Sequence, residues 1–306
     1  MKVIVCGGAG LIGHRLSSFL LESGYEVIVL DRNRSRIESP KLHSFPVNLL
    51  RTEDFDRSWF EGVSAVVNLS GKDVLKLWTE EYKKAIWESR VTVNERLVDF
   101  MSTLDSKPTV FVSASAVGYY GDTGDREIDE NTPAGEGFLA DVCVAWERAA
   151  RRAETLGMRS VQVRTAPVLS SEGGFLQKLT QSMKFGLTVR FGEGSNWFPW
   201  IHMQDLVQIY ELTLRETRLS GPVNACAPGF VRFRELLDLV RRYRKAVVLP
   251  LPVALFRMVS KELAEELTHS QKIFPAKLRD VGFRFRYGAL AKALEDVFGR
   301  MGTGVS

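Results

Sequence analysis

The stretch VCGGAGLIG at residues 5–13 decides the fold, because it joins an apolar run to a helical pattern through closely spaced glycines. The run KVIVC at 2–6 predicts a buried strand of a parallel sheet. Apolar residues then recur with helical spacing over 11–23, and Gly24 ends that pattern. The sequence therefore predicts a strand–turn–helix unit at its beginning.

The glycines of this turn follow a GxxGxxG pattern at Gly7, Gly10 and Gly13. One glycine makes the tight turn, one lets the backbone approach a pyrophosphate, and one lets the helix pack closely on the strand. The free N–H groups at the helix start, near Leu11 and Ile12, then point at the phosphates together with the positive end of the helix dipole. Between a predicted strand and a predicted helix, this pattern favours a dinucleotide site over a structural turn.

The second strand, YEVIVL at 25–30, ends in an acid followed by alternating arginines. Asp31 is placed to accept hydrogen bonds from the ribose hydroxyls of NAD, and its charge repels the 2′-phosphate of NADP. Arg32 is placed to stack on adenine or to pair with that phosphate, since a guanidinium matches phosphate geometry. We interpret Arg34 and Arg36 as solvated loop charges.

Further apolar runs alternate with helical patterns along the chain. Strands are predicted at 64–69, 109–115, 159–165 and 222–227, and long helices at 79–101 and 137–156. This alternation predicts a Rossmann-like α/β fold with a doubly wound parallel sheet. We expect a cofactor-binding domain over 1–227, with a substrate loop at about 170–200, and a smaller, mostly helical C-terminal lobe over 228–306.

Composition and sequence patterns argue against several classes of protein. The 306 residues carry 41 basic and 37 acidic side chains, and no basic arm argues for nucleic-acid binding. No apolar run is long enough to span a bilayer, and the first residues lack the pattern of a signal peptide. Three distant cysteines without a CxxC pair argue against disulfides and zinc. We expect a cytoplasmic protein with a small-molecule substrate, no nucleic-acid or membrane partner, and an oligomeric state that the sequence leaves open.

Beyond these patterns, blocks in a fixed order resemble those of the atypical and extended short-chain dehydrogenase/reductases. The resemblance is closest to the bacterial epimerase family protein group, with its nucleotide-sugar-epimerase-like fold and characteristic C-terminal domain. The blocks are GGAGLIG at 7–13, VVNLSGK at 66–72, WTEEYKKAIWESR at 78–90, VSASAVGYYG at 112–121, WE at 146–147, VRTAPVLSSEGG at 163–174, WFPWIHMQDL at 197–206, GPVNACAP at 221–228 and IFPAKLRDVGFRFRY at 273–287.

The resemblance implies an NAD(P)-binding fold, with cofactor contacts extending to Leu69, Ser70 and Gly71. Members of the group resemble NADP-preferring proteins, with a small hydroxyl residue in place of Asp31 and an arginine at the position of Arg32. We therefore favour NADP(H) as the cofactor and keep NAD(H) as the alternative.

Short-chain dehydrogenases generally use a serine, a tyrosine and a lysine four residues after the tyrosine. Ser115 fits the serine, but the other two positions fall at about Leu139 and Cys143, which cannot perform acid–base chemistry. Tyr119 and Tyr120 follow Ser115 closely. Either tyrosine is a candidate substitute proton donor, and both are equally consistent with filling the pocket wall.

Other candidate site residues lie on a helix and in the glycine-rich loop. Arg90 is expected to face the cofactor edge, where its charge needs an anionic ligand or a structural acid. Lys178, Asn196, Trp197 and Trp200 combine aromatic and polar groups that suit a small polar substrate. Core packing is the alternative for Trp200.

The pair His202 and Asp205 has helical spacing, but no third or fourth metal ligand lies near it in sequence. We therefore predict no metal site. Asp205 is interpreted as the N-cap of the helix that follows, and His202 as a structural or substrate-loop residue.

The sequence leaves two hypotheses for the function. The first is an NADP(H)-dependent oxidoreductase or epimerase with a non-standard active site, which the serine, the paired tyrosines and the aromatic loop favour. The second is a catalytically degenerate cofactor-binding regulator or redox-sensing partner protein, which the missing tyrosine–lysine pair favours.

Overall fold

The computed structural model describes residues 1–254 and 261–303. The chain forms two compact units, each assembled from separate stretches. The first contains residues 1–116, 141–164 and 207–223, and the second contains 117–140, 165–206 and 224–306. The expected domain boundary at 227/228 stays a prediction.

The first unit is built on a seven-stranded sheet with the order β11-β7-β5-β4-β1-β2-β3. Its strands are β1 (Lys2–Cys6), β2 (Glu26–Asp31), β3 (Leu42–Pro46), β4 (Val63–Asn68), β5 (Val110–Ala116), β7 (Arg159–Thr165) and β11 (Gly221–Ala225). The pairs β3–β2, β2–β1, β1–β4 and β4–β5 are parallel. Strand order changes direction next to β1, and sheets of this kind bind ligands outside the carboxyl ends of the strands at such a point.

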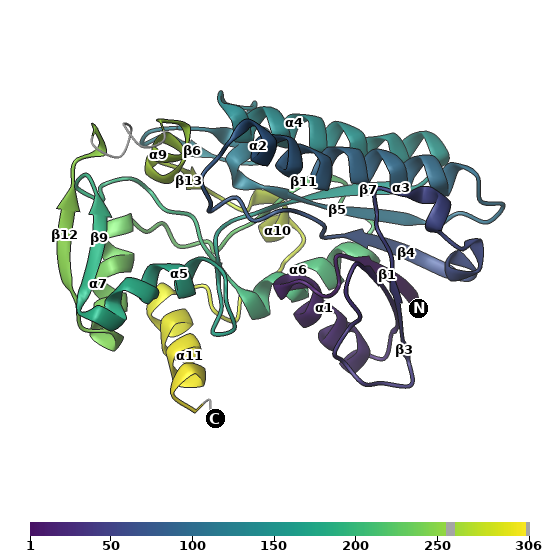
Figure 1. Cartoon of the computed structure of the whole chain (residues 1–306), viewed down its shortest axis with the longest axis horizontal. Coiled ribbons are helices and arrows are strands. Elements are labelled where there is room, and N and C mark those ends of the chain that lie inside the picture. The colour runs from purple at the N-terminus through teal and green to yellow at the C-terminus, as the bar shows by residue number, and fades with distance from the viewer. Residues whose placement is uncertain (255–260, 304–306) are drawn as a thin grey trace. The chain divides into compact units, whose positions relative to one another are not determined.

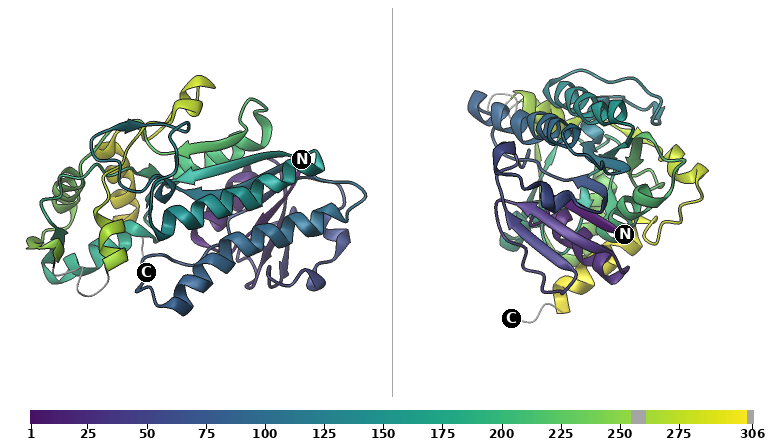
Figure 2. Two further views of the ribbon diagram at one scale, coloured as in Figure 1. Left: turned by 90° about the horizontal axis from the view of Figure 1, so that it is seen from above. Right: turned by 90° about the vertical axis from the view of Figure 1, so that its right-hand side faces the viewer.

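Helices cover both faces of this sheet, as Figure 1 shows, with α2, α3 and α4 on one face and α1 on the other. They are α1 (Leu11–Glu22), α2 (Glu80–Trp87), α3 (Val93–Ser102) and α4 (Phe138–Arg151), and α6 (Met203–Arg215) continues into this unit. Figure 2 gives two further views of this layering. The predicted doubly wound Rossmann-like fold is confirmed.

The apolar strand residues form the core of the first unit. Ile4, Ile28 and Val66 are at most 2% exposed and pack with Leu97 and Met101 of α3. Burial of apolar side chains from a sheet and a helix in one cluster is the main favourable term in folding such a unit.

The expected helix at 79–101 is interrupted. Thr79 is the N-cap of α2 and accepts a hydrogen bond from the backbone N–H of Tyr82. A π-helical turn, η3 (Glu88–Thr92), separates α2 from α3. Turns of this kind insert an extra residue into a helix and are frequent at functional sites.

The second unit contains three two-stranded sheets: β10 (Ile201–His202) with β8 (Val168–Leu169), β12 (Val247–Leu251) with β9 (Leu187–Phe191), and β13 (Lys272–Ile273) with β6 (Glu127–Ile128). Its helices include α5 (Phe175–Gln181), α7 (Phe233–Tyr243), α9 (Lys261–Thr268), α10 (Ala276–Asp280) and α11 (Leu290–Thr303), with short turns η4 (Val117–Tyr120) and η6 (Ser182–Phe185). The predicted helical lobe over 228–306 lies partly outside the described residues, at 255–260 and 304–306. Leu236, Leu237 and Leu294 belong to its hydrophobic core.

Candidate functional site

The glycine turn joins β1 to α1 in the first unit. Gly7 has a φ of +76°, a left-handed conformation that favours glycine. A Cβ atom on Gly13 would lie 2.3 Å from the carbonyl oxygen of Gly7, so only glycine lets the helix start this close to the turn. The resulting cradle of backbone atoms at a helix N-terminus suits a phosphate group.

Asp31 and Arg32 follow at the end of β2. The Asp31 carboxylate accepts hydrogen bonds from the backbone N–H of Ala9, at 3.2 Å, and of Asn33, at 3.0 Å. Each oxygen therefore already has a donor, and the carboxylate connects the glycine turn to the loop after β2. Arg32 is exposed.

A polar network lies at the end of β4, beside the predicted contacts Leu69, Ser70 and Gly71. Asn68 accepts hydrogen bonds from the Ser70 backbone N–H at 3.1 Å and from the Ser70 hydroxyl at 2.6 Å. Its own side chain donates to Asn94 at 2.6 Å. The network orients the Ser70 loop, and sequence reasoning missed it, although Asn68 is a polar residue at the end of an apolar strand.

Arg90 lies in the π-helical turn and contacts this same loop. Its guanidinium donates to the carbonyl oxygen of Lys72 at 2.8 Å and lies 5.2 Å from the ring centroid of Trp146. A Cβ atom on Gly71 would lie 3.2 Å from the guanidinium. Backbone and aromatic contacts thus place the positive charge of Arg90 on the Gly71 loop.

Ser115, near the end of β5, belongs to a buried triad of polar residues. Its hydroxyl donates to Glu147 Oε1 at 2.8 Å. Arg164 donates to both oxygens of Glu147, at 2.7 and 2.9 Å. All three residues are at most 4% exposed. Ser115 is predictable from its motif, whereas no local pattern connects Glu147 and Arg164 with it.

The two positions expected to hold the tyrosine and lysine are apolar in character. Leu139 is buried, and Cys143 is buried with its Sγ 3.7 Å from the carbonyl oxygen of Ala116. Neither side chain supplies an acid or a base in place of the missing pair.

The paired tyrosines lie in turn η4 of the second unit. Tyr120 is 1% exposed, and its hydroxyl donates to Asn224 Oδ1 at 2.7 Å. Asn224 in turn donates its backbone N–H to the buried Glu130. Tyr119 is half-buried, and its ring lies edge-on to Tyr120 with centroids 5.3 Å apart. The two tyrosines therefore have different surroundings.

The two tryptophans of the glycine-rich loop, Trp197 and Trp200, have different surroundings. The Trp197 indole donates to Asp125 at 2.7 Å, and the Arg232 guanidinium lies 4.1 Å from its ring centroid. Trp200 is 1% exposed and belongs to the hydrophobic core. Asn196 donates to the carbonyl oxygen of His269 at 3.2 Å.

Gln271 joins this loop to the tyrosine turn. Its backbone N–H donates to the carbonyl oxygen of Trp197 at 3.0 Å, and its side chain donates to the carbonyl oxygens of Val117 and Gly121 at 3.1 and 2.9 Å. The second unit thus brings the tyrosine turn and Trp197 together through Gln271. Lys178 is exposed on α5, a separate helix of the same unit.

Glu266 and His269 lie on and after α9, beside the same cluster. The Glu266 carboxylate is 3.5 Å from His269 Nδ1, and a Cβ atom on Gly118 would lie 3.3 Å from it. Burial raises the pKa of Glu266 to about 7 and lowers that of His269. Sequence reasoning missed both residues, because nothing local in the sequence relates α9 to the tyrosine turn.

The interpretation of Asp205 as an N-cap is wrong. Helix α6 begins at Met203, so Asp205 lies inside the first turn. Its carboxylate accepts hydrogen bonds from the backbone N–H groups of Arg286 and Tyr287, at 2.8 and 2.9 Å. A contact about eighty residues away in sequence therefore determines its role, which local capping rules cannot anticipate.

His202 is buried in the second unit, as a structural residue would be. Its Nδ1 accepts a hydrogen bond from the Gln204 backbone N–H at 3.1 Å, and its Nε2 lies 3.3 Å from Asp296. Burial lowers the pKa of His202 to about 4, so the ring is neutral near pH 7. In the described part of the chain, no group of three or more His, Cys, Asp or Glu residues is arranged to hold a metal ion.

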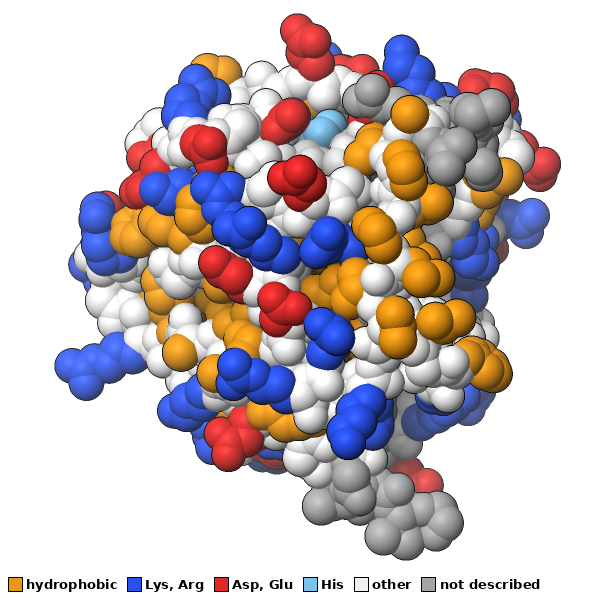
Figure 3. Space-filling model, turned by 90° about the vertical axis from the view of Figure 1, so that its left-hand side faces the viewer, with side chains coloured by type: hydrophobic (Ala, Val, Ile, Leu, Met, Phe, Trp, Pro, Cys, Tyr) orange, Lys and Arg blue, Asp and Glu red, His pale blue; other side chains and the backbone are white. Residues whose placement is uncertain are grey.

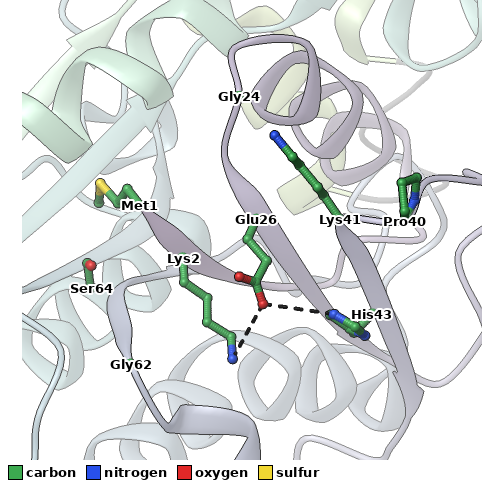
Figure 4. Close-up of a pocket in the computed structure, with 9 residues that line it drawn as sticks. All are labelled: Met1, Lys2, Gly24, Glu26, Pro40, Lys41, His43, Gly62 and Ser64. Carbon is green, nitrogen blue, oxygen red and sulfur yellow. Dashed lines mark ion pairs between the residues drawn. The ribbon is translucent and has the colours of Figure 1, made fainter.

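A separate hollow lies at the opposite ends of the strands from the glycine turn. Lys2, Glu26 and His43 line it (Figure 4), with Glu26 3.5 Å from the Lys2 ammonium and 3.9 Å from the His43 ring. Since β1 begins at Lys2 and ends before Gly7, this hollow is distinct from the cofactor edge. Glu26 forms an ion pair with Lys2 in this hollow, and Lys41 also lines it.

Comparisons with known proteins agree with this geometry. Residues 3–226 match the NAD dependent epimerase/dehydratase family, and residues 251–297 match a domain of unknown function, DUF1731. An epimerase family protein of Mycobacterium bovis is 36% identical over 295 residues, covering 95% of this chain and 96% of that protein.

Two solved structures are similar over nearly the whole chain. The human epimerase family protein SDR39U1, solved with NADPH, has a TM-score of 0.83 at 27% identity and covers 98% of this chain and 99% of its own. The UDP-glucose 4-epimerase of Thermus thermophilus, solved with NAD, has a TM-score of 0.83 at 20% identity, with full coverage of both chains at 100%. At that identity the second similarity shows the fold alone.

Proposed function

The chain belongs to the NAD dependent epimerase/dehydratase family, and from this premise we propose that it is an NADP(H)-dependent oxidoreductase or epimerase. Its substrate in this proposal is a small polar or sugar-like molecule. The observation that carries the cofactor choice is the pair Asp31 and Arg32. Both oxygens of the acid already accept backbone hydrogen bonds, whereas the adjacent base is exposed.

The residues present fit a dinucleotide. Gly13 lets α1 begin close against the turn, and the free N–H groups at the start of α1 are the donors for a phosphate. Arg32 holds the 2′-phosphate through a charge-assisted hydrogen bond. The Ser70 loop, oriented by Asn68, contacts the cofactor, and Arg90 supplies positive charge beside that loop. When bound, the nicotinamide supplies a hydride donor or acceptor. The NADPH in the structure of the human relative supports this choice.

For proton transfer, the surroundings of the two tyrosines favour Tyr119. The hydroxyl of Tyr120 is buried and engaged with Asn224. Tyr119 is half-buried, and its turn is held next to Trp197 by Gln271, so a substrate bound beside Trp197 comes within reach of this turn. Ser115 keeps a fixed orientation through Glu147.

The cofactor choice is tested by titrating the purified protein with NADPH and with NADH. We expect tighter binding of NADPH, and Arg32→Ala should weaken NADPH binding about 5- to 150-fold through loss of roughly 1–3 kcal/mol, with little effect on NADH. Arg34→Ala is the matched control and should bind NADPH like the unaltered protein. Tighter binding of NADH, or equal effects of the two substitutions, would refute the proposed role of Arg32.

A second candidate, a cofactor-binding regulator without catalytic activity, is favoured by one specific observation. The positions expected for the tyrosine and lysine hold the buried residues Leu139 and Cys143. A screen of metabolites that follows NADPH absorbance distinguishes the two proposals. Turnover that falls in Tyr119→Phe but persists in Tyr120→Phe supports the enzyme, whereas turnover that survives in both variants removes the tyrosines as proton donors.

A cytoplasmic setting also remains a proposal. Cys6, Cys143 and Cys226 are all buried free thiols, which suits a reducing compartment. Among the described residues, no helix has the length and apolarity needed to cross a bilayer.

A further inference from the structure

The two-stranded sheet of β9 and β12 turns an apolar face outward. Val247 pairs with Leu187, and Leu249 pairs with Val189, so these four side chains lie on the same side of the sheet. They are 61%, 45%, 45% and 37% exposed, respectively. Phe185, just before β9, is 84% exposed. We call these five residues the apolar ribbon face.

The other side of the same sheet packs inward. Thr188 is 1% exposed, and Val248 packs against the hydrophobic core of the second unit. The alternation is therefore regular, but the outward positions carry aliphatic residues where a solvated sheet face carries polar ones. In the described chain, ten large hydrophobic residues are exposed, and the ribbon face supplies five of them. An exposed apolar cluster of this kind marks an interaction surface.

The two segments that form the ribbon face carry basic side chains but no acidic ones. The segments 184–191 and 244–251 contain Lys184, Arg190, Arg244 and Lys245 and no acidic residue. Figure 3 views the molecule from the side of β12 and shows hydrophobic side chains gathered there, with Lys and Arg side chains near them. The apolar side chains and the bases of these segments therefore favour a partner that is both apolar and negatively charged.

We propose that the ribbon face is a docking site for an anionic lipid surface. Lys and Arg beside exposed Phe and aliphatic side chains are the composition of segments that lie in a membrane interface, where the apolar groups enter the headgroup boundary and the bases attract anionic lipids. A second copy of this chain is the less suitable occupant, because two ribbon faces in contact would bring like charges together.

This mode of binding differs from a membrane span. The expectation of no membrane partner rested on the lack of a long apolar segment, and a ribbon of two short strands needs no such segment to lie on a lipid surface. The proposal does not depend on the cofactor or on catalysis.

The test is co-sedimentation of the full chain with vesicles of phosphatidylcholine alone or of equal parts phosphatidylcholine and phosphatidylglycerol. We expect binding to the anionic vesicles only, and weaker binding as salt is raised. The triple variant Phe185→Ser/Val247→Ser/Leu249→Ser should bind at least about tenfold more weakly. The control Leu77→Ser/Val144→Ser removes exposed apolar residues elsewhere and should bind normally. Circular dichroism and thermal melting verify that each variant folds.

The charge reversal Lys184→Glu/Lys245→Glu tests the same face without altering its apolar residues, and it should also weaken binding; Arg57→Glu is its control. Failure of the unaltered protein to sediment with anionic vesicles overturns the proposal, as does normal binding by both ribbon variants. Light scattering that shows a concentration-dependent dimer, lost in the triple variant, together with no vesicle binding, would assign the face to a second copy instead. The NADPH titration is independent of every one of these outcomes.

Discussion

Asp31 and Arg32 are adjacent in sequence, yet the structure gives their side chains different surroundings. The sequence leaves open whether the acid holds a ribose or the base holds a phosphate. Two hydrogen bonds to backbone N–H groups give the carboxylate a structural role that residue type alone does not reveal. The carboxylate thus connects the glycine turn to the loop after β2, and Arg32 stays exposed beside it.

His202 predicts a pH dependence of stability at the same scale. Its pKa in the folded protein is about 4, below the ordinary 6.5, chiefly because the ring is buried. Between these values the unfolded chain binds a proton that the folded chain does not, so stability falls as pH decreases from about 6.5 to 4. The full effect is about 3 kcal/mol. Urea unfolding of the unaltered protein and of His202→Gln, at pH 7 and pH 4.5, should show a smaller loss in the variant.

Glu266 must be controlled in that measurement, because its titration has the opposite sign. Burial raises its pKa from 4.5 to about 7. The cost of burying its charge is therefore lost as pH falls through this range, and stability increases. The comparison is therefore made with Glu266→Gln in both proteins. If the Glu266→Gln protein loses the same stability at low pH with and without His202→Gln, the lowered pKa of His202 is contradicted.

At the scale of elements, the sequence predicts most of the sheet and little of its edge. Six of the strands fall where apolar runs predicted them, because buried parallel strands are nearly continuous in hydrophobicity. Strand β3, LHSFP, is missed because it is an edge strand with mixed polarity and a terminal proline. The π-helical turn is missed because the helical periodicity continues on both sides of it.

The candidate site is predictable only in part for a related reason. The glycine turn and Asp31 are recognisable because their spacing is local. Gln271 holds the tyrosine turn through Val117, which lies 154 residues earlier in the sequence. Glu147 binds Ser115, which lies 32 residues before it. Side-chain hydrogen bonds over such separations depend on the packed fold, and no pattern in a short window indicates them.

Gly13 predicts an effect at the scale of the strand–turn–helix element. In Gly13→Ala, the added methyl group would lie 2.3 Å from the Gly7 carbonyl oxygen, so α1 must move away from the turn. We expect a loss of stability of about 1–3 kcal/mol and a large loss of NADPH affinity. Chemical denaturation and fluorescence titration measure the two effects.

Gly299→Ala is the matched control, because that helical glycine has open space around it, and the change should be neutral or stabilising by up to about 1 kcal/mol. Normal NADPH binding by Gly13→Ala would contradict the proposal that the glycine turn binds the phosphates of the cofactor.

The whole molecule consists of two compact units, but its chain passes between them repeatedly. The boundaries fall after residues 116, 140, 164, 206 and 223. Four of these five crossings lie inside α4, β7, α6 and β11, as the bounds of those elements show. Neither unit is therefore a continuous segment, and unfolding one unit alone would break helices and strands that supply residues to the other.

This connectivity predicts that the chain unfolds in one cooperative transition, although its 306 residues would allow two domains. NADPH at about one hundred times its dissociation constant should then shift the entire transition upward, by about 2.7 kcal/mol in free energy of unfolding. Differential scanning calorimetry measures both, with Arg32→Ala as the variant whose shift is reduced and Arg34→Ala as its control.

Two separate transitions, of which only one responds to NADPH, would contradict the cooperative coupling but not the cofactor proposal. A single transition that NADPH leaves unmoved would contradict the cofactor proposal instead. The same experiment thus separates the cooperativity imposed by the path of the chain from the cofactor binding assigned to the glycine turn.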